Sequence, residues 1–162
     1  MGTGTGLSMT TAVSRELVQD YFQAQLSRDP ARIAPFLHDD VDWSIAGPVD
    51  LLHFCGERHG KAAMIDSIVQ RVPSVLQVTS YAIDEILIDG DRAVTFMRLT
   101  AIHTATGRTV SYRCAQFLRF REGKLVEFRA LIDSFDAAEQ VLGHPIEVAP
   151  AETRHVGRLF AI

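Results

Sequence analysis

The sequence predicts an α+β domain in which a strongly curved antiparallel sheet wraps around N-terminal helices. Three observations lead to this fold class. Apolar residues recur at helical spacing in the first part of the chain, up to about Val72. After Pro73 the hydrophobic period changes to two, and short turn motifs divide the chain into strand-like segments. Helices first and strands later are typical of α+β domains, and 162 residues suit a single domain.

Four helices are expected from apolar spacing and from capping residues. Ser14 is placed to cap the first helix, because its hydroxyl can accept a hydrogen bond from an exposed backbone N–H group. Pro30 suits the first turn of the second helix, and Pro73 is expected to end the third. The last helix should stop at Gly143. The predicted helices are residues 14–27, 30–37, 61–72 and 136–142.

The strands are expected where apolar and polar residues alternate. Residues 41–45 form the first strand. The loop that follows, residues 46–60, contains glycine and proline but is unusually apolar, so we expect it to lie across the open end of the sheet. Hairpin turns then connect four strands at residues 77–88, 93–103, 109–120 and 125–132.

Turn lengths predict which residues lie side by side on the last two strands. A three-residue turn at residues 122–124 places Gln116 beside Ala130 and Arg119 beside Glu127. The glycine in this turn can supply the left-handed backbone conformation that such a turn needs.

The two preceding strands are connected by a predicted four-residue turn at residues 105–108. This turn places Met97 beside Gln116 and Leu99 beside Cys114, with all four side chains facing the helices.

The register of the strand at residues 77–88 stays open, and with it the direction of Asp84. A two-residue turn at residues 89–90 turns one set of side chains inward: Ala82, Asp84 and Ile86. A three-residue turn instead turns the alternate set inward: Tyr81, Ile83 and Glu85. A β-bulge is compatible with either arrangement.

Composition argues against several kinds of partner. The 16 Lys and Arg residues are outnumbered by 20 Asp and Glu residues and form no basic run, so we expect no nucleic acid. No apolar run approaches the ~20 residues of a membrane span. Two cysteines, Cys55 and Cys114, are too few for a disulfide framework and indicate reduced thiols in the cytoplasm. No metal-ligand spacing or nucleotide-binding motif is present, so we expect no metal and no cofactor.

Five segments of the chain carry a family resemblance: VQDYF (18–22), FLHDDVDW (36–43), GKAAM (60–64), FREGKL (120–125) and FRALID (128–133). They resemble the nuclear transport factor 2-like superfamily, in its SnoaL-like and ketosteroid isomerase-like branch. The resemblance implies a cone-shaped fold, a deep apolar pocket and a homodimer formed through the outer sheet face, where Phe96, Ile102 and Phe117 would contribute. We accordingly divide the chain into a flexible lead-in (1–11), a SnoaL-like domain (12–145) and a C-terminal tail (146–162).

The resemblance also implies how such a pocket can act. Ketosteroid isomerases use an Asp base, together with a Tyr and a protonated Asp that stabilise an enolate oxygen. The Tyr position of this family falls on Tyr21, and the protonated-Asp position falls on Gln116, whose amide can also donate a hydrogen bond. The position of the base falls on Ile45, which cannot accept a proton.

Another group must therefore accept the proton if the chain is an enzyme. Asp84 is a candidate if it faces inward, because burial would raise its pKa towards that of a useful general base. His53 and His59, on the apolar loop, are alternatives. The epoxide-hydrolase pattern of the same superfamily is not matched, because its five positions fall on Leu99, Met97, Ala130, Trp43 and Ile45.

Two functions remain. The first is an isomerase, cyclase or lyase that acts on a small hydrophobic carbonyl compound by acid–base chemistry, with Tyr21, Gln116 and Asp84 as catalytic candidates. The second is a non-catalytic, homodimeric binding module for a small apolar ligand. In both, the inward-facing residues line the pocket: Phe22, Trp43, Ile45, Met97, Leu99, Tyr112, Cys114, Phe128 and Ile132.

Overall fold

The computed structural model describes residues 12–147. The predicted lead-in, residues 1–11, and residues 148–162 of the predicted tail lie outside the described residues. Within residues 12–147, no helix is both long enough and apolar enough to cross a bilayer.

The first helices are close to the prediction. Helix α1 (Arg15–Ser27) is capped by Ser14, whose hydroxyl accepts a hydrogen bond from the Leu17 backbone N–H at 3.0 Å. Pro30 opens the short helix α2 (Pro30–Ile33), and the 3₁₀ turn η1 (Ala34–Phe36) follows. The predicted helix is thus interrupted and ends one residue early.

The third predicted helix runs past Pro73, which the prediction placed at its end. It consists of α3 (Lys61–Asp66), the π-helical segment η2 (Ser67–Arg71) and α4 (Val72–Val75). Pro73 lies in the first turn of α4, where a missing N–H group is tolerated. The wider hydrogen-bonding pattern of the π segment precedes it, so the helix continues to Val75.

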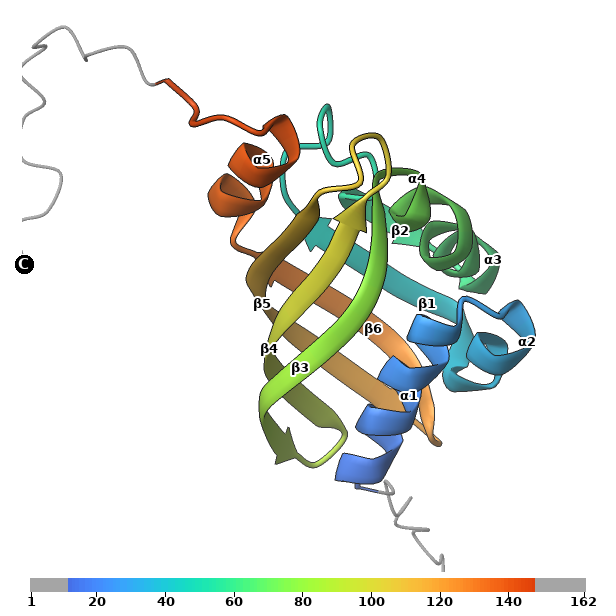
Figure 1. Cartoon of the computed structure of the whole chain (residues 1–162). Coiled ribbons are helices and arrows are strands. Elements are labelled where there is room, and N and C mark those ends of the chain that lie inside the picture. The colour runs from blue at the N-terminus through green and yellow to red at the C-terminus, as the bar shows by residue number, and fades with distance from the viewer. Residues whose placement is uncertain (1–11, 148–162) are drawn as a thin grey trace, which may run out of the picture.

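The described residues form one six-stranded sheet with the order β2-β1-β6-β5-β4-β3. All neighbouring strands are antiparallel except β1 and β6, which are parallel. Figure 1 shows the sheet curving past α1, α3 and α4, with α5 (Ser134–Leu142) following the end of β6. The strands are β1 (Leu37–Ala46), β2 (Gly56–His59), β3 (Leu76–Asp89), β4 (Arg92–His103), β5 (Thr109–Arg121) and β6 (Lys124–Ile132).

The register between β5 and β6 is confirmed, although its cause differs from the prediction. Gln116 pairs with Ala130, and Arg119 pairs with Glu127. The turn contains two residues rather than three, and a β-bulge next to Arg119 restores the alternation. Glu122 takes a φ of 52°, as a tight hairpin turn of this kind requires.

The register between β4 and β5 differs from the prediction by two residues. Met97 pairs with Cys114 and Leu99 with Tyr112. The turn begins one residue earlier than predicted, because the His103 backbone N–H donates to the Arg108 carbonyl at 2.8 Å and closes it there.

A bulge in β3 resolves the open direction of Asp84. The turn between β3 and β4 holds two residues, since Asp89 pairs with Arg92. The register then shifts between Ile83 and Glu85, and Asp84 lies in this bulge with its side chain exposed. Tyr81, beyond the bulge, packs against the core.

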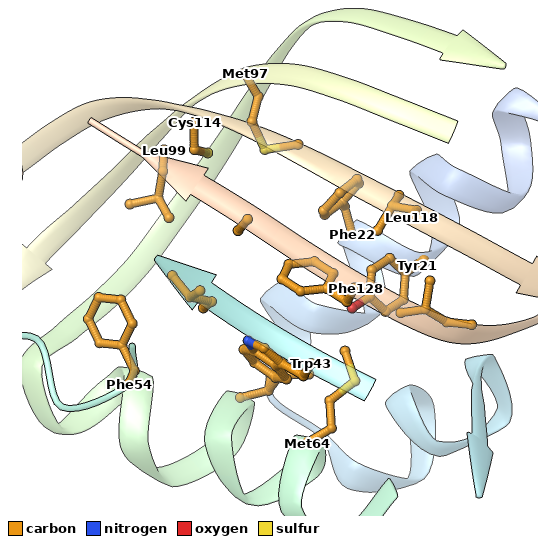
Figure 2. Packing of buried hydrophobic residues seen from close by; sticks show 14 of the residues in the cluster. Tyr21, Phe22, Trp43, Phe54, Met64, Met97, Leu99, Cys114, Leu118 and Phe128 are labelled. Atoms are coloured by element: carbon orange, nitrogen blue, oxygen red, sulfur yellow. The ribbon is translucent and has the colours of Figure 1, made fainter. Parts of the chain in front are cut away.

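The core fills the space between the concave face of the sheet and the helices. Val18, Tyr21 and Phe22 of α1 and Met64 of α3 are each at most 1% exposed. Burying a large apolar side chain contributes about 1.5–3 kcal/mol. Figure 2 shows Tyr21 and Phe22 near Leu118 and Phe128 of the sheet, and Met64 near Trp43. The sheet and α1 are thus held rigidly around the pocket described next.

Candidate functional site

A mainly apolar cavity of about 60 Å³ lies between the sheet and the C-terminal end of α1, η2 and α4. One water molecule needs about 10–15 Å³ of such space, so the cavity holds only a few water-sized groups. The predicted pocket residues that line it are Trp43, Ile45, Leu99, Tyr112, Cys114, Gln116, Phe128 and Ile132. Phe22 and Met97 are buried in the core and do not line the cavity.

Gln116 places a polar side chain in this apolar wall. Its neighbour across the sheet is Ala130, a small residue that leaves the amide uncovered on that side. The amide nitrogen contacts the Cys114 sulfur at 3.8 Å, and the side-chain oxygen is buried with no hydrogen-bond partner among residues 12–147. A buried acceptor without a partner is costly, so this oxygen is available to a ligand that donates a hydrogen bond.

Trp43 supplies the complementary group. Its indole ring packs against Phe128 with ring centroids 5.2 Å apart, which fixes the ring in the cavity wall. The indole nitrogen is buried and, within the described part of the chain, has no hydrogen-bond acceptor. In Figure 2 this nitrogen is on the edge of the ring that faces Phe54 and Leu99. Both of those residues also line the cavity.

Tyr21 and Asp84 are not part of the cavity wall. The Tyr21 hydroxyl accepts a hydrogen bond from the amide nitrogen of Gln25, one helical turn along α1. The Gln25 side-chain oxygen in turn accepts a hydrogen bond from the Tyr81 hydroxyl at 3.1 Å. Gln25 and Tyr81 do line the cavity, so Tyr21 supports its wall from behind.

The titratable groups in the wall hold their protons at neutral pH. Burial raises the pKa of Tyr112 and that of Tyr81 well above the ordinary value. Burial also raises the pKa of the Cys114 thiol to about 11, which makes the thiol a poor nucleophile. No carboxylate or imidazole of residues 12–147 lines the cavity. The wall can therefore donate hydrogen bonds but offers no ordinary general base.

The histidines considered as proton carriers lie outside the wall. His59 bonds to the Asp42 carboxylate at 2.7 Å, and both side chains are exposed. This hydrogen bond raises the pKa of His59. His53 bonds to the Val49 carbonyl at 3.1 Å. In the described residues, no cluster of His, Cys, Asp and Glu is suited to hold a metal ion.

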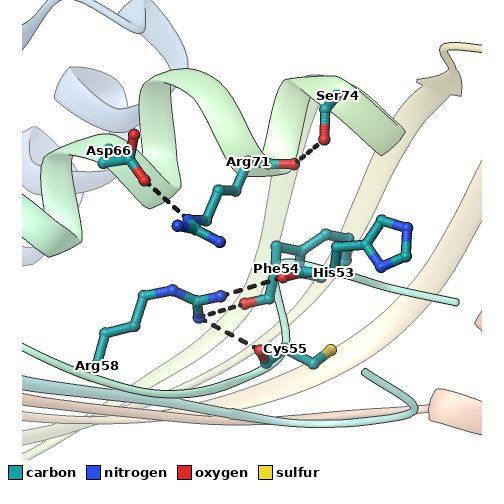
Figure 3. A network of polar contacts seen from close by, with 7 residues as sticks. All are labelled: His53, Phe54, Cys55, Arg58, Asp66, Arg71 and Ser74. Carbon is teal, nitrogen blue, oxygen red and sulfur yellow. Dashed lines mark hydrogen bonds and ion pairs between the residues drawn. The ribbon is translucent and has the colours of Figure 1, made fainter. Parts of the chain in front are cut away.

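The loop between β1 and β2 covers part of the cavity, as its apolar sequence predicted, through Phe54. Arg58 holds this loop in place. Its guanidinium donates hydrogen bonds to three consecutive backbone carbonyls, those of His53 (3.0 Å), Phe54 (2.9 Å) and Cys55 (3.3 Å). Figure 3 shows these contacts beside the Arg71–Asp66 ion pair on the neighbouring helix. Phe54 is 3% exposed, so Arg58 fixes an aromatic wall residue through its backbone.

Sequence reasoning missed Gln25 and Tyr81 as wall residues. A local signal was present for Gln25, which follows Tyr21 by four residues and therefore lies on the same face of α1. The inward direction of Tyr81 depended on the bulge at Asp84. This bulge decides which face of the sheet the preceding residues of β3 occupy.

Comparison with known proteins places these observations in a family. Residues 18–128 match the family model of the SnoaL-like domain. A search of curated proteins found no match. Among solved structures, the "Putative Isomerase from Rhodopseudomonas palustris" is 29% identical with a TM-score of 0.74, and the alignment covers 82% of this chain and all of that one.

Two further structures share the fold at lower identity. An NTF2-like protein of unknown function from Burkholderia pseudomallei is 24% identical, with a TM-score of 0.67 over 78% of this chain and 93% of that one. TerC, co-crystallised with polyporic acid, is 24% identical, with a TM-score of 0.64 over 73% of this chain and 89% of that one. The family match extends from α1 to β6 and includes most of the cavity wall. The chain belongs to the SnoaL-like family, and it shares the fold of NTF2-like proteins.

Proposed function

We propose that this protein binds a small hydrophobic carbonyl compound in the cavity and acts on it as an isomerase, cyclase or lyase. The observation that carries the proposal is the buried, unpartnered indole N–H of Trp43 in a mainly apolar wall. A carbonyl oxygen is the acceptor that such a donor lacks, and the remaining wall suits an apolar body. SnoaL-like membership and the 29% identical putative isomerase support a family-level role of the isomerase or cyclase type.

The wall supports one half of the proposed acid–base chemistry directly. Hydrogen-bond donors aimed at a carbonyl oxygen stabilise the negative charge that develops there when a neighbouring C–H bond loses its proton. Trp43 and the neutral Tyr112 hydroxyl are the donors in the wall. Gln116, through its free oxygen, can accept a hydrogen bond from an enol or hydroxyl group of the same substrate.

The proton acceptor in this scheme comes from the substrate or from a water in the cavity. Asp84, the sequence-based candidate, is exposed in the bulge of β3 and does not face the substrate space. The scheme therefore favours substrates that carry a second oxygen next to the acidic C–H bond, since that oxygen can receive the proton within the bound molecule.

The second candidate function is a binding module without catalysis. The observation that favours it is the cavity wall itself, which contains no carboxylate or imidazole among the described residues. In this case Trp43 and Gln116 select the ligand, and no bond is made or broken.

The homodimer is part of both proposals. On the outer face of the sheet, Phe96, Phe117 and Leu131 are 43%, 45% and 55% exposed. Ala115 of β5 pairs with Phe96 of β4 on one side and with Leu131 of β6 on the other. These three strands therefore present one apolar patch, which includes Phe117 of β5. We propose that a second copy covers this patch. We also propose a cytoplasmic location, because Cys55 and Cys114 are both free thiols.

Hydrogen exchange separates the two candidate functions. The protein is incubated in D₂O with a panel of small aromatic and aliphatic ketones, and deuterium incorporation next to the carbonyl is followed by NMR. Enzyme-dependent incorporation that falls at least tenfold in Trp43→Phe supports the isomerase proposal. Binding without incorporation moves the assignment to the binding module, and no binding across the panel contradicts both.

A further inference from the structure

The charge distribution around the cavity points to a more specific ligand. Arg28 is the single formally charged side chain in the cavity wall as the described residues define it. All its other lining residues are apolar, or polar and neutral at pH 7. Arg28 is exposed and belongs to the cavity wall, so the cavity reaches the surface at this residue. A ligand in the cavity therefore meets a positive charge at the mouth and none in the interior.

The guanidinium of Arg28 is not used by the rest of the described chain. None of the ion pairs among residues 12–147 includes Arg28. The adjacent Asp29 carboxylate instead accepts a hydrogen bond from the Ala31 backbone N–H at 2.9 Å, as the cap of α2. Arg28 is thus available to an anion that reaches the mouth.

The backbone of Arg28 is a second, independent observation. The residue ends α1 in the left-handed conformation, with φ 53° and ψ 20°. This helix-ending position is usually occupied by glycine, because a side chain there is strained. A positive charge near the C-terminus of a helix interacts favourably with the helix dipole. A basic residue in the last turn of the helix would supply that charge without backbone strain. The left-handed cap places this particular residue at the cavity mouth.

We infer that the ligand is an apolar carboxylic acid, whose hydrophobic part enters the cavity and whose carboxylate is held at the mouth by Arg28. This inference rests on the proposed function and narrows its substrate class from carbonyl compounds to keto acids. Arginine binds a carboxylate with two parallel hydrogen bonds, which also fixes the orientation of the bound molecule. The ketone of the same molecule then extends inward towards Trp43.

The test uses three related probes small enough for the cavity: 4-oxopentanoate, its neutral amide, and pentanoate, which keeps the acid but lacks the ketone. Trp43 is the single tryptophan in the sequence and lines the cavity, so its fluorescence reports binding. We expect the keto acid to bind roughly fivefold to tenfold more tightly than its amide, with a preference that shrinks as salt is added.

Variants separate the local contact from a general charge effect. Arg28→Gln should abolish the preference for the acid and leave the affinity for the amide unchanged. Arg32→Gln is the matched control: it removes the same charge from an exposed residue of α2 that does not line the cavity, and should keep the preference. Arg28→Gly removes the charge while relieving backbone strain, so its unfolding temperature should rise as the preference disappears.

The outcomes distinguish this inference from the proposed function. Equal affinity of the keto acid and the amide overturns the role of Arg28, while the proposed carbonyl pocket survives. An equal loss of preference in Arg32→Gln also overturns it, because the effect is then not local. If the acid without the ketone binds as tightly as the keto acid, and both bind more tightly than the amide, the role of Arg28 is supported and the carbonyl contact of the proposed function fails. If none of the probes binds, both are contradicted.

Discussion

Trp43 and Gln116 lie in the wall of the same cavity, and each has a buried polar atom that no described residue satisfies. One atom is a donor and the other an acceptor. Buried polar atoms of a folded core usually form hydrogen bonds, and a buried polar atom without a partner costs about 1–3 kcal/mol. Two such atoms of opposite kind in one small cavity are best explained by a ligand that completes both.

Gln116→Leu should weaken ligand binding without lowering the stability of the protein. Leucine fills a similar volume and removes the unsatisfied oxygen, so the free energy of unfolding should be unchanged or rise by about 1 kcal/mol. Affinity for a hydroxyl-bearing ligand should fall about tenfold. Urea denaturation and calorimetric titration measure the two effects. A loss of stability of the same size as that in a typical core variant would show that Gln116 is a structural residue.

Tyr21→Phe should lower the stability of the protein but have little effect on its affinity for the ligand. The change removes the hydroxyl that accepts the Gln25 amide hydrogen bond in a fully buried place, so we expect a loss of about 1–3 kcal/mol. Ligand affinity should change less than threefold, because Tyr21 does not line the cavity. Tyr81→Phe is the comparison, since that hydroxyl belongs to a wall residue. If Tyr21→Phe abolished turnover while the fold stayed intact, Tyr21 would regain the role of oxyanion donor.

Arg58→Met should loosen the loop that carries Phe54. The variant keeps an unbranched side chain but removes the donors to three consecutive carbonyls. Backbone amides of residues 51–56 should exchange with solvent at least tenfold faster, and the ligand should dissociate faster. Arg71→Met is the matched control, because it breaks only an exposed ion pair of small energetic value. Equal exchange rates in the two variants would contradict the role of Arg58.

The stability of the protein should fall at alkaline pH through Cys114. Burial raises the pKa of this thiol from 9.0 to about 11. The folded state therefore holds the proton more tightly than the unfolded state, and the stability that results is fully present below about pH 9. It is lost as the pH rises towards about 11 and amounts to roughly 2–3 kcal/mol.

The measurement is urea denaturation at several pH values between 8 and about 11. Cys114→Ala should flatten the decline, although its stability at pH 8 will be lower because of the lost volume. Cys55→Ala is the comparison, since burial raises the pKa of Cys55 to about 11 as well. A decline of unchanged slope in both variants would assign the alkaline transition to other groups.

Phe117→Glu should separate the proposed dimer into monomers. The side chain is 45% exposed on the outer face of β5, so the substitution leaves the core unchanged. Sedimentation velocity should show a single species of half the mass. Leu142→Glu is the control, because Leu142 is similarly exposed (43%) but lies on α5 and not on the sheet. A wild-type protein that sediments as a monomer would contradict the dimer itself.

Local sequence signals predicted most of the fold. Ser14 and Gly143 marked helix ends because their chemistry satisfies the backbone there. The bulges at Asp84 of β3 and Val126 of β6 could not be predicted, because each inserts one residue where the curved sheet requires it, not where a local motif marks it. One inserted residue reverses the parity of everything beyond it, which is why Tyr81 faces inward.

The site was predictable as far as strand parity reaches. Alternation correctly turned Trp43, Ile45 and Gln116 towards one face of the sheet, and all three line the cavity. Parity does not tell a cavity from a packed core, so it assigns Met97 to the pocket although this residue packs in the core. Helical spacing does the same for Phe22, which lies on α1. The same applies to Tyr21, whose helix face is buried but whose hydroxyl is engaged by Gln25.

Carbonyl binding is tested most directly by the NMR signal of the Trp43 indole N–H, which is the single indole signal expected because the sequence has one tryptophan. We expect a large downfield proton shift when the keto acid binds, because the indole then donates to the ketone oxygen, and a much smaller shift with the acid that lacks the ketone. An indole signal that moves equally with both probes, or with neither, would contradict the claim that Trp43 binds a carbonyl group.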